Sequence, residues 1–367
     1  MTLSEIDELV MPVLRRTCDE VDRDARLPLE ALAAIEDIGL FDQEPAVTRA
    51  CEIAEALAKG CGATAMIWAM HQAQRASIVH HAGSGRQREL ILELLRPFPG
   101  RAGRLVASVT SEVGTGGDIG RSVAQVEGSN GCLALRKRAT TISYASIAST
   151  FLVSAGRSGE SRPTDQVGVV LGSRQVTLTD ATGWDTLGMR GTSSPGYTLT
   201  AEFENWQILP APFAEIAAET MLPWSHLLWS AVWVGLATEA LHRASRILRH
   251  NKTTDSRLAE AHGRLSVVRS LLYSAAKEVE QARQRGHGLS IPMTVRLNDL
   301  KVTSSTTCVR VALSALEICG MRGYAERSEF SVSRILRDLL SAPLMVSNRR
   351  LLEANSQFLA AGKVFVS

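Results

Sequence analysis

The spacing of hydrophobic residues changes twice along the chain. From residue 4 to about 96 apolar residues recur every three or four positions, which predicts amphipathic helices. Between about 105 and 212 they alternate along short runs that are separated by turn residues, which predicts strands. From about 217 to 361 the helical spacing returns. The sequence therefore predicts three domains: 1–104 α-helical, 105–214 β and 215–367 α-helical.

The β domain and the last domain differ in the length of their elements. Short apolar runs at regular spacing are typical of a small sandwich or barrel, with strands expected at 167–171, 175–178, 197–199 and 206–209. The last domain carries long helical patterns with short Gly- or Asn-bearing turns between them, which favours an antiparallel four-helix bundle. Its helices are expected at about 221–250, 255–286, 290–320 and 331–361.

A glycine-rich stretch follows the apolar run at the start of the β domain. Residues 107–120 read ASVTSEVGTGGDIG. Glycine reaches positive φ and lets a ligand approach main-chain N–H groups, so the stretch is either a cofactor loop or a tight turn between strands. A dinucleotide-binding turn needs a helix after the glycines, whereas residues 122–126 alternate like a strand. We therefore expect a strand, a loop and a second strand.

Residues 111–118, SEVGTGGD, resemble the T-E-P-G-A-G-S-D flavin loop of the acyl-CoA dehydrogenase superfamily. Other stretches follow in that family's order: KRATT at 137–141, WDTLGMRGTS at 184–193, GMRGY at 320–324, and Arg337-Asp338. The resemblance spans nearly the whole chain. It implies a mostly α fold with an N-terminal helical domain, a middle β-barrel and a C-terminal four-helix bundle, with FAD as the cofactor and a homodimer or homotetramer as the assembly.

The same resemblance assigns the cofactor-binding residues. Thr110 and Ser111 would face the edge of the flavin ring, and Thr141 would meet the ring from the next loop. Gly116 and Gly117 would approach the pyrophosphate. Three features depart from the family: its pyrophosphate-contacting serine is Gly117 here, its flavin-flanking tryptophan is Ala139, and its arginine–x–x–phenylalanine has no match in residues 249–256.

The residue that removes a proton from the substrate is the largest departure. The family's usual catalytic glutamate falls on Val346 and its alternative base position falls on Ser225, and neither side chain can take a proton from carbon. His226 beside it is our preferred base, because imidazole ordinarily titrates near neutral pH. A structural histidine is the alternative. Glu326 and Glu329 are the second choice, with solvated loop charges as the alternative.

The resemblance implies FAD-dependent α,β-dehydrogenation of an acyl thioester carried by coenzyme A or acyl carrier protein. That reaction requires a flavin site, donors that polarise the thioester carbonyl, and a base. Flavin monooxygenases of the same fold also lack the glutamate, so a monooxygenase is the alternative, and a non-catalytic scaffold is the third hypothesis. An electron acceptor or a flavin reductase is the implied partner.

Composition excludes several other classes. The formal net charge of +2 and the dispersed cations do not favour nucleic-acid binding. Six cysteines without a C-x-x-C pair, and histidines without metal-ligand spacing, indicate reduced thiols rather than zinc or disulfides, which favours a cytoplasmic protein. The N-terminus lacks a signal-peptide pattern, and the most apolar window, 227–241, is too short to span a bilayer. Met66, Trp68 and His71 fit a helix core better than a cofactor site.

Overall fold

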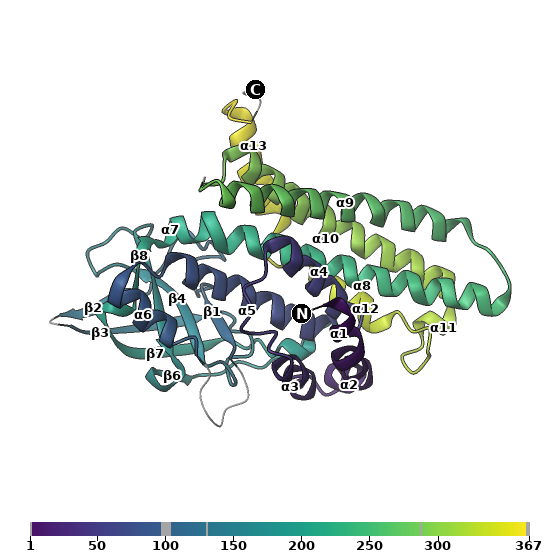
Figure 1. The fold of residues 1–367 in the computed structure, drawn as a ribbon, viewed down its shortest axis with the longest axis horizontal. Helices are drawn as coiled ribbons and strands as arrows, with labels where there is room; N and C mark the ends of the chain where they lie inside the picture. Colours follow the sequence, from purple (N-terminus) through teal and green to yellow (C-terminus); the bar gives the residue numbers. More distant parts are fainter. Residues whose placement is uncertain (1, 97–103, 130, 287, 365–367) are drawn as a thin grey trace.

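A computed structural model of the chain describes residues 2–96, 104–129, 131–286 and 288–364. The N-terminal domain is helical, as its apolar spacing predicts. Its helices are α1 (Leu3–Glu5), a π-helical turn (Ile6–Val10), α2 (Met11–Arg23), α3 (Leu29–Asp37), α4 (Val47–Ala58), α5 (Gly62–His81) and α6 (Gly85–Glu93). Helix α5 packs against both the β domain and the C-terminal helices (Figure 1). Met66 and Trp68 are fully buried within it, which confirms the prediction that they belong to the core.

The β domain consists of two four-stranded sheets. The first has the order β1-β4-β5-β8, formed by β1 (Val106–Val109), β4 (Thr150–Gly156), β5 (Gln166–Gly172) and β8 (Ile208–Pro212). The second has the order β2-β3-β7-β6, formed by β2 (Val126–Ser129), β3 (Cys132–Ala139), β7 (Tyr197–Glu204) and β6 (Val176–Thr179). Strands β1 and β4 pair in parallel and the other neighbours pair antiparallel. An isolated bridge between Gln125 and Gly156 joins the two sheets.

The glycine-rich stretch joins β1 to β2, so the predicted order of strand, loop and strand is confirmed. The second strand, however, begins at Val126 and not at residue 122. The backbone N–H groups of Val123 and Ala124 donate to the carboxylate of Glu112, so they are not available to a strand ladder. A buried side chain therefore takes over backbone donors that the alternating pattern assigned to a sheet.

Three long helices run side by side away from the β domain (Figure 1): α8 (Leu222–Asn251), α9 (Ser256–Gln284) and α10 (Ile291–Cys319). The short helix α7 (Phe213–Ile216) and a π-helical turn (Ala217–Met221) lead into them, and α11 (Met321–Tyr324) follows them.

The prediction of a fourth long helix at 331–361 is wrong. That segment contains α12 (Ser333–Leu339) and α13 (Asn348–Ala360), with turns between them. Pro343 lies in the gap, where its ring is incompatible with a helix interior. Val346 has φ 47°, a left-handed conformation that a continuing helix cannot contain. The three domain limits remain predictions.

Candidate functional site

Glu112 shapes the glycine-rich loop from inside the protein. Its buried carboxylate accepts hydrogen bonds from Ser122 Oγ at 2.8 Å, from Val123 N at 3.0 Å and from Ala124 N at 2.7 Å. Backbone donors aimed at a buried carboxylate satisfy its charge and fix the chain around it. The glutamate of the flavin-loop motif therefore anchors both ends of the loop and is not exposed to a substrate.

Lys137, from the second motif, completes this anchor. Its buried Nζ lies 3.4 Å from a Glu112 carboxylate oxygen and donates to the backbone oxygen of Ser154 at 2.6 Å. Burial lowers the pKa of Lys137 to about 8, and the opposing charge of Glu112 acts against that shift. The pair ties β3 to the loop and to β4.

Ser111 and Thr141 meet at the mouth of the loop. Ser111 Oγ donates to the backbone oxygen of Thr141 at 3.1 Å and accepts from its N–H at 3.2 Å. Their hydroxyl oxygens are 3.3 Å apart, and both residues are partly exposed. The Thr110 hydroxyl lies 3.1 Å from that of Ser108. Two segments far apart in sequence thus present a small group of hydroxyls, while Ala139 at the end of β3 is buried and offers no aromatic ring.

Gly116 and Gly117 form the outer part of the loop, at φ 62° and 82°. Arg350 on α13 donates to both of their backbone oxygens, at 2.7 Å for Gly116. A Cβ added at Gly117 would lie 3.3 Å from this guanidinium group, so glycine permits its close approach. Sequence reasoning missed Arg350, and the adjacent cations Arg349 and Arg350 after the Arg337-Asp338 motif were its one available signal.

The residues present fit a flavin phosphate. A guanidinium group beside a glycine loop with positive φ angles combines a fixed cation with accessible backbone, a combination that suits phosphate oxygens. The hydroxyls of Ser111 and Thr141 are suited to the polar edge of a flavin ring. These groups are the ones that could hold the cofactor in this chain.

The motif at residues 184–193 and the Arg337-Asp338 motif contact each other and not the glycine-rich loop. Met189 N donates to Asp338 Oδ1 at 2.6 Å, and Arg337 pairs with Asp22 of α2. A Cβ at Gly188 would overlap the carbonyl group of Arg337. Burial raises the pKa of Asp338 to about 6. These motif residues therefore join the β domain to both helical domains.

His226 lies on α8 and is buried, with 2% of its surface exposed. Burial lowers its pKa to about 3, and the positive charge of Lys301 on α10 contributes to that shift. Its Nε2 atom has no hydrogen-bond partner among the described residues. The imidazole is therefore neutral at physiological pH, and a pKa that low makes it a weak proton acceptor.

Neither position where the family carries a base holds a carboxylate. Ser225 is buried in α8. Val346 is half-buried in the turns before α13, and its backbone oxygen accepts a hydrogen bond of 2.7 Å from Lys301 Nζ. The second-choice residues, Glu326 and Glu329, are exposed. Both lie among arginines, as in the 2.7 Å ion pair of Glu329 with Arg246, which agrees with solvated loop charges.

His71 has the structural role that we favoured. Its Nδ1 accepts from Val106 N at 3.0 Å, and its Nε2 lies 3.0 Å from the backbone oxygen of Phe41. Because a carbonyl only accepts, Nε2 carries the proton. Burial lowers the pKa of His71 to about 4, so it remains neutral while it fastens α5 to β1.

Two kinds of feature are absent from the described residues. None of their helices is both long and apolar enough to cross a bilayer. No group of three or more His, Cys, Asp or Glu side chains in the described ranges is arranged to hold a metal ion.

Comparison with known proteins identifies the fold. The family described as acyl-CoA dehydrogenase, C-terminal domain, matches residues 215–345. Butyryl-CoA dehydrogenase from Megasphaera elsdenii superposes with a TM-score of 0.81 at 18% identity, over 98% of this chain and 97% of that chain. The chain has the acyl-CoA dehydrogenase fold. The predicted resemblance and the mostly α fold class with a central β domain are confirmed.

Other structures with the acyl-CoA dehydrogenase fold carry different activities in their names. The FMN-bound dibenzothiophene monooxygenase TdsC from Paenibacillus sp. A11-2 has a TM-score of 0.82 at 17% identity, over 97% of this chain and 96% of that chain. A nitrososynthase from Micromonospora carbonacea var. africana has a TM-score of 0.81 at 18% identity, over 97% and 96%. No curated protein sequence matches the chain. The acyl-CoA dehydrogenase fold alone therefore leaves the reaction open.

Proposed function

We propose that this chain is a flavin-dependent oxidoreductase whose flavin lies against the loop at residues 110–117. Ser111 and Thr141 would contact the ring edge, Thr110 would support them from the end of β1, and Gly116 and Gly117 would approach the phosphate. Arg350 would leave the two glycine carbonyl groups and pair with the phosphate instead. The contact of Arg350 with this loop is the observation that supports the cofactor assignment.

The expected cofactor was FAD, but we propose that FMN binds more tightly. FAD in the family relies on a serine at the position of Gly117 and on an arginine–x–x–phenylalanine that is absent from residues 249–256. One arginine beside a glycine loop suits a single terminal phosphate group. FMN is also bound in the TdsC structure, which has the same fold.

We propose that the chain catalyses monooxygenation, and we rank this reaction above α,β-dehydrogenation of an acyl thioester. The supporting observation is the absence of a carboxylate at Val346 and Ser225, together with the low pKa of His226. Removal of an α-proton needs a base whose pKa is near the working pH. Monooxygenation does not need one: reduced flavin supplies two electrons, one oxygen atom of O₂ enters the substrate, and the other leaves as water. A flavin reductase would then be the partner.

In this proposal His226 is a positioning residue and not the base. Its unpartnered Nε2 is available for one hydrogen bond, and a neutral ring can orient a polar substrate atom without carrying charge. Lys301 fixes the segment around Val346, which would form part of the substrate wall. Dehydrogenation of an acyl thioester on coenzyme A or acyl carrier protein remains the second candidate, because the family match at 215–345 favours it.

The test begins with cofactor binding and then separates the two reactions. Purified protein is mixed with about 100 μM FMN or FAD, a concentration that nearly fills even a micromolar site. If neither flavin is retained, the flavin proposal is wrong and the scaffold hypothesis takes its place.

The flavin complex is next mixed anaerobically with butyryl-CoA as a thioester probe. Bleaching of the flavin by this thioester would support the dehydrogenase and contradict the monooxygenase. Chemically reduced complex is separately exposed to O₂ with indole or dibenzothiophene. Formation of an oxygenated product that carries label from ¹⁸O₂ supports the monooxygenase.

A further inference from the structure

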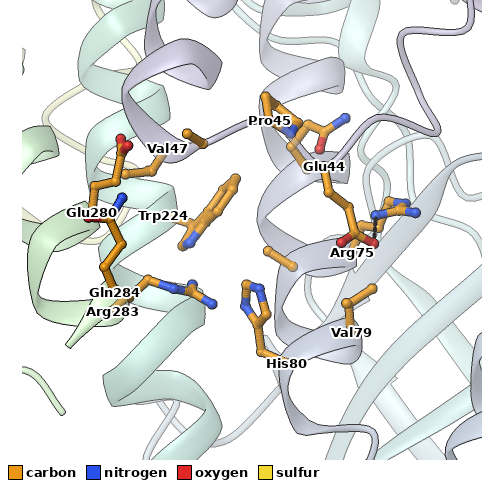
Figure 2. A pocket seen from close by; sticks show the side chains of 13 residues that line it. Glu44, Pro45, Val47, Arg75, Val79, His80, Trp224, Glu280, Arg283 and Gln284 are labelled. Carbon is orange, nitrogen blue, oxygen red and sulfur yellow. Dashed lines mark hydrogen bonds and ion pairs between the residues drawn. The ribbon is translucent and has the colours of Figure 1, made fainter. Parts of the chain in front are cut away.

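A cavity lies in the helical part of the molecule. It has a volume of about 260 Å³, is partly open to solvent, and is lined by residues of α5, α8 and α9 and by residues 44–47 (Figure 2). Its apolar wall includes Pro45, Val47, Ala76 and Val79. None of the proposed flavin-site residues lines it, so it is separate from the glycine loop.

Arg283 on α9 brings a positive charge to this cavity, and no ion pair joins it to a carboxylate of the described residues. Its side chain is half-buried, and its Nη1 atom is buried without a hydrogen-bond partner in the described ranges. Burial lowers its pKa, and no neighbouring charge of the described chain acts on it appreciably. A guanidinium group does not lose its proton in proteins, so the cost of burying it can be offset only by an acceptor. Arg283 therefore lacks an acceptor of complementary charge.

Two further side chains converge on the same space. Trp224 on α8 is 5% exposed, and its indole N–H has no acceptor among the described residues. His80 on α5 faces it, with ring centroids 6.4 Å apart. Burial, and then the charge of Arg283, lower the pKa of His80 to about 4, so the imidazole is neutral. Figure 2 shows the Arg283 guanidinium group directed towards His80, beside the Trp224 ring.

The acidic residues of the wall determine which anion fits. Glu44 pairs with Arg75 at 2.7 Å, and Glu280 accepts from Thr48 N at 3.3 Å. Both side chains line the cavity, and two carboxylates there disfavour a dianion such as phosphate. A monoanion is attracted by Arg283 and is repelled less strongly by the two carboxylates.

We propose that this cavity binds the carboxylate group of a small organic acid with an apolar body. One carboxylate oxygen accepts from Arg283 and the other from the indole N–H of Trp224, while the body packs against Val47, Ala76 and Val79. Arginine and carboxylate form charge-assisted hydrogen bonds, and an indole N–H is a pure donor. The site needs no flavin, so it stands apart from the proposed oxidoreductase activity.

The test uses benzoate as the probe and isothermal titration calorimetry as the measurement, on the full chain without added flavin. We expect benzoate to bind at least tenfold more tightly than benzamide, which keeps the ring but lacks the charge, and more tightly than inorganic phosphate. Absence of benzoate binding at ~10 mM, or equal binding of benzamide, would overturn the proposal.

Substitutions then assign the binding to the cavity. Arg283→Gln should weaken benzoate binding at least tenfold, whereas the matched control Arg285→Gln, on an exposed arginine outside the cavity, should leave it unchanged. Trp224→Phe keeps the apolar wall but removes the N–H donor, and it should weaken binding several-fold. If circular dichroism shows that Arg283→Gln fails to fold, the effect of Trp224→Phe on benzoate binding becomes the deciding measurement. Binding that survives in Arg283→Gln and Trp224→Phe, or an equal loss in Arg285→Gln, contradicts the proposal.

Discussion

Lys301 Nζ donates a hydrogen bond of 2.7 Å to the backbone oxygen of Val346, so α10 fastens the segment between α12 and α13. The same nitrogen lies 2.7 Å from Asn348 Oδ1 and 5.7 Å from the centre of the Trp233 ring. No carboxylate among the described residues pairs with this buried lysine. A cation therefore lies next to the backbone of Val346, the position that the resemblance assigns to the family's catalytic carboxylate.

Burial lowers the pKa of Lys301 to about 8, against about 10.4 for an unfolded lysine. Between these values the unfolded state binds more protons, so the contribution of Lys301 to stability rises as pH rises. We expect the free energy of unfolding of the wild type, minus that of Lys301→Met, to increase from pH 8 to pH 10 by up to about 1.4 kcal/mol per unit. Urea denaturation at several pH values measures it, and a difference that is independent of pH would contradict the expectation.

Breaking the buried pair of Glu112 and Lys137 is expected to lower the free energy of unfolding. Glu112→Gln removes the charge that faces buried Lys137 and turns an amide NH₂ towards backbone donors. Breaking a buried pair by removing one partner costs about 3–5 kcal/mol. We expect a loss of that order by urea denaturation, with weaker flavin binding. The control Glu127→Gln, at an exposed position on β2, should change neither, and a loss under about 1 kcal/mol in Glu112→Gln would refute a buried structural pair.

Replacing Arg350 is expected to change the affinity for flavin with little change in the free energy of unfolding. It is exposed and touches the loop only through the backbone oxygens of Gly116 and Gly117. Arg350→Gln should weaken FMN binding at least tenfold, because a charge-assisted pair with phosphate is lost. Arg349→Gln is the matched control, since Arg349 faces Glu353 on α13. Fluorescence titration of FMN measures both, and equal affinity in the two variants would separate Arg350 from the phosphate site.

Replacing Gly188 tests how tightly the β domain packs against α12. A Cβ at this position would overlap the backbone carbonyl group of Arg337, so Gly188→Ala must displace main chain on one side. We expect a loss of about 2 kcal/mol or more, in the range of strong overpacking effects. Gly183→Ala has open space around its Cβ and should be close to neutral. Thermal unfolding of both variants measures the difference, and equal midpoints would show that the contact relaxes at little cost.

His226 predicts a pH effect of the same direction as Lys301, in a lower pH range. Its folded pKa of about 3 lies below about 6.5 for an unfolded histidine, so the unfolded state binds more protons between those values. The stabilising contribution of neutral His226 is complete above pH 6.5 and falls as pH falls towards 3. We expect the stability of the wild type, minus that of His226→Gln, to decrease from pH 7 to pH 5. A constant difference would indicate a hydrated imidazole.

The sequence also allows a direct test of His226 as a base. A general base contributes on the order of 10²–10⁴ in rate. Because we propose a positioning role, His226→Gln, which keeps a hydrogen-bonding group, should retain flavin and lose less than about tenfold in turnover, below that general-base range. His226→Ala should mainly raise KM. A loss of 10² or more in kcat for His226→Gln would instead support the base assignment.

The sequence by itself determined the alternation of helical and β regions and the burial of Met66, Trp68 and His71. Hydrophobic period is a local property, so residues a few positions apart carry it whatever the rest of the chain does. The flavin-loop motif likewise assigned Ser111 and Thr141 to one flavin ring, because its order and spacing resemble those of a known family. Pro343 indicates a break in the last helix, but the long apolar pattern around it favoured one continuous helix.

Only the tertiary structure decided which distant side chains share a space. Arg350 reaches Gly117 across 233 positions, and the start of β2 moved because Glu112 takes backbone donors that the strand pattern assigned to a ladder. The low pKa of His226 and the placement of Arg283 and Trp224 on one cavity arise from the packing of separate helices. Desolvation and contact geometry depend on how whole elements dock, and residue spacing within one element does not contain that information.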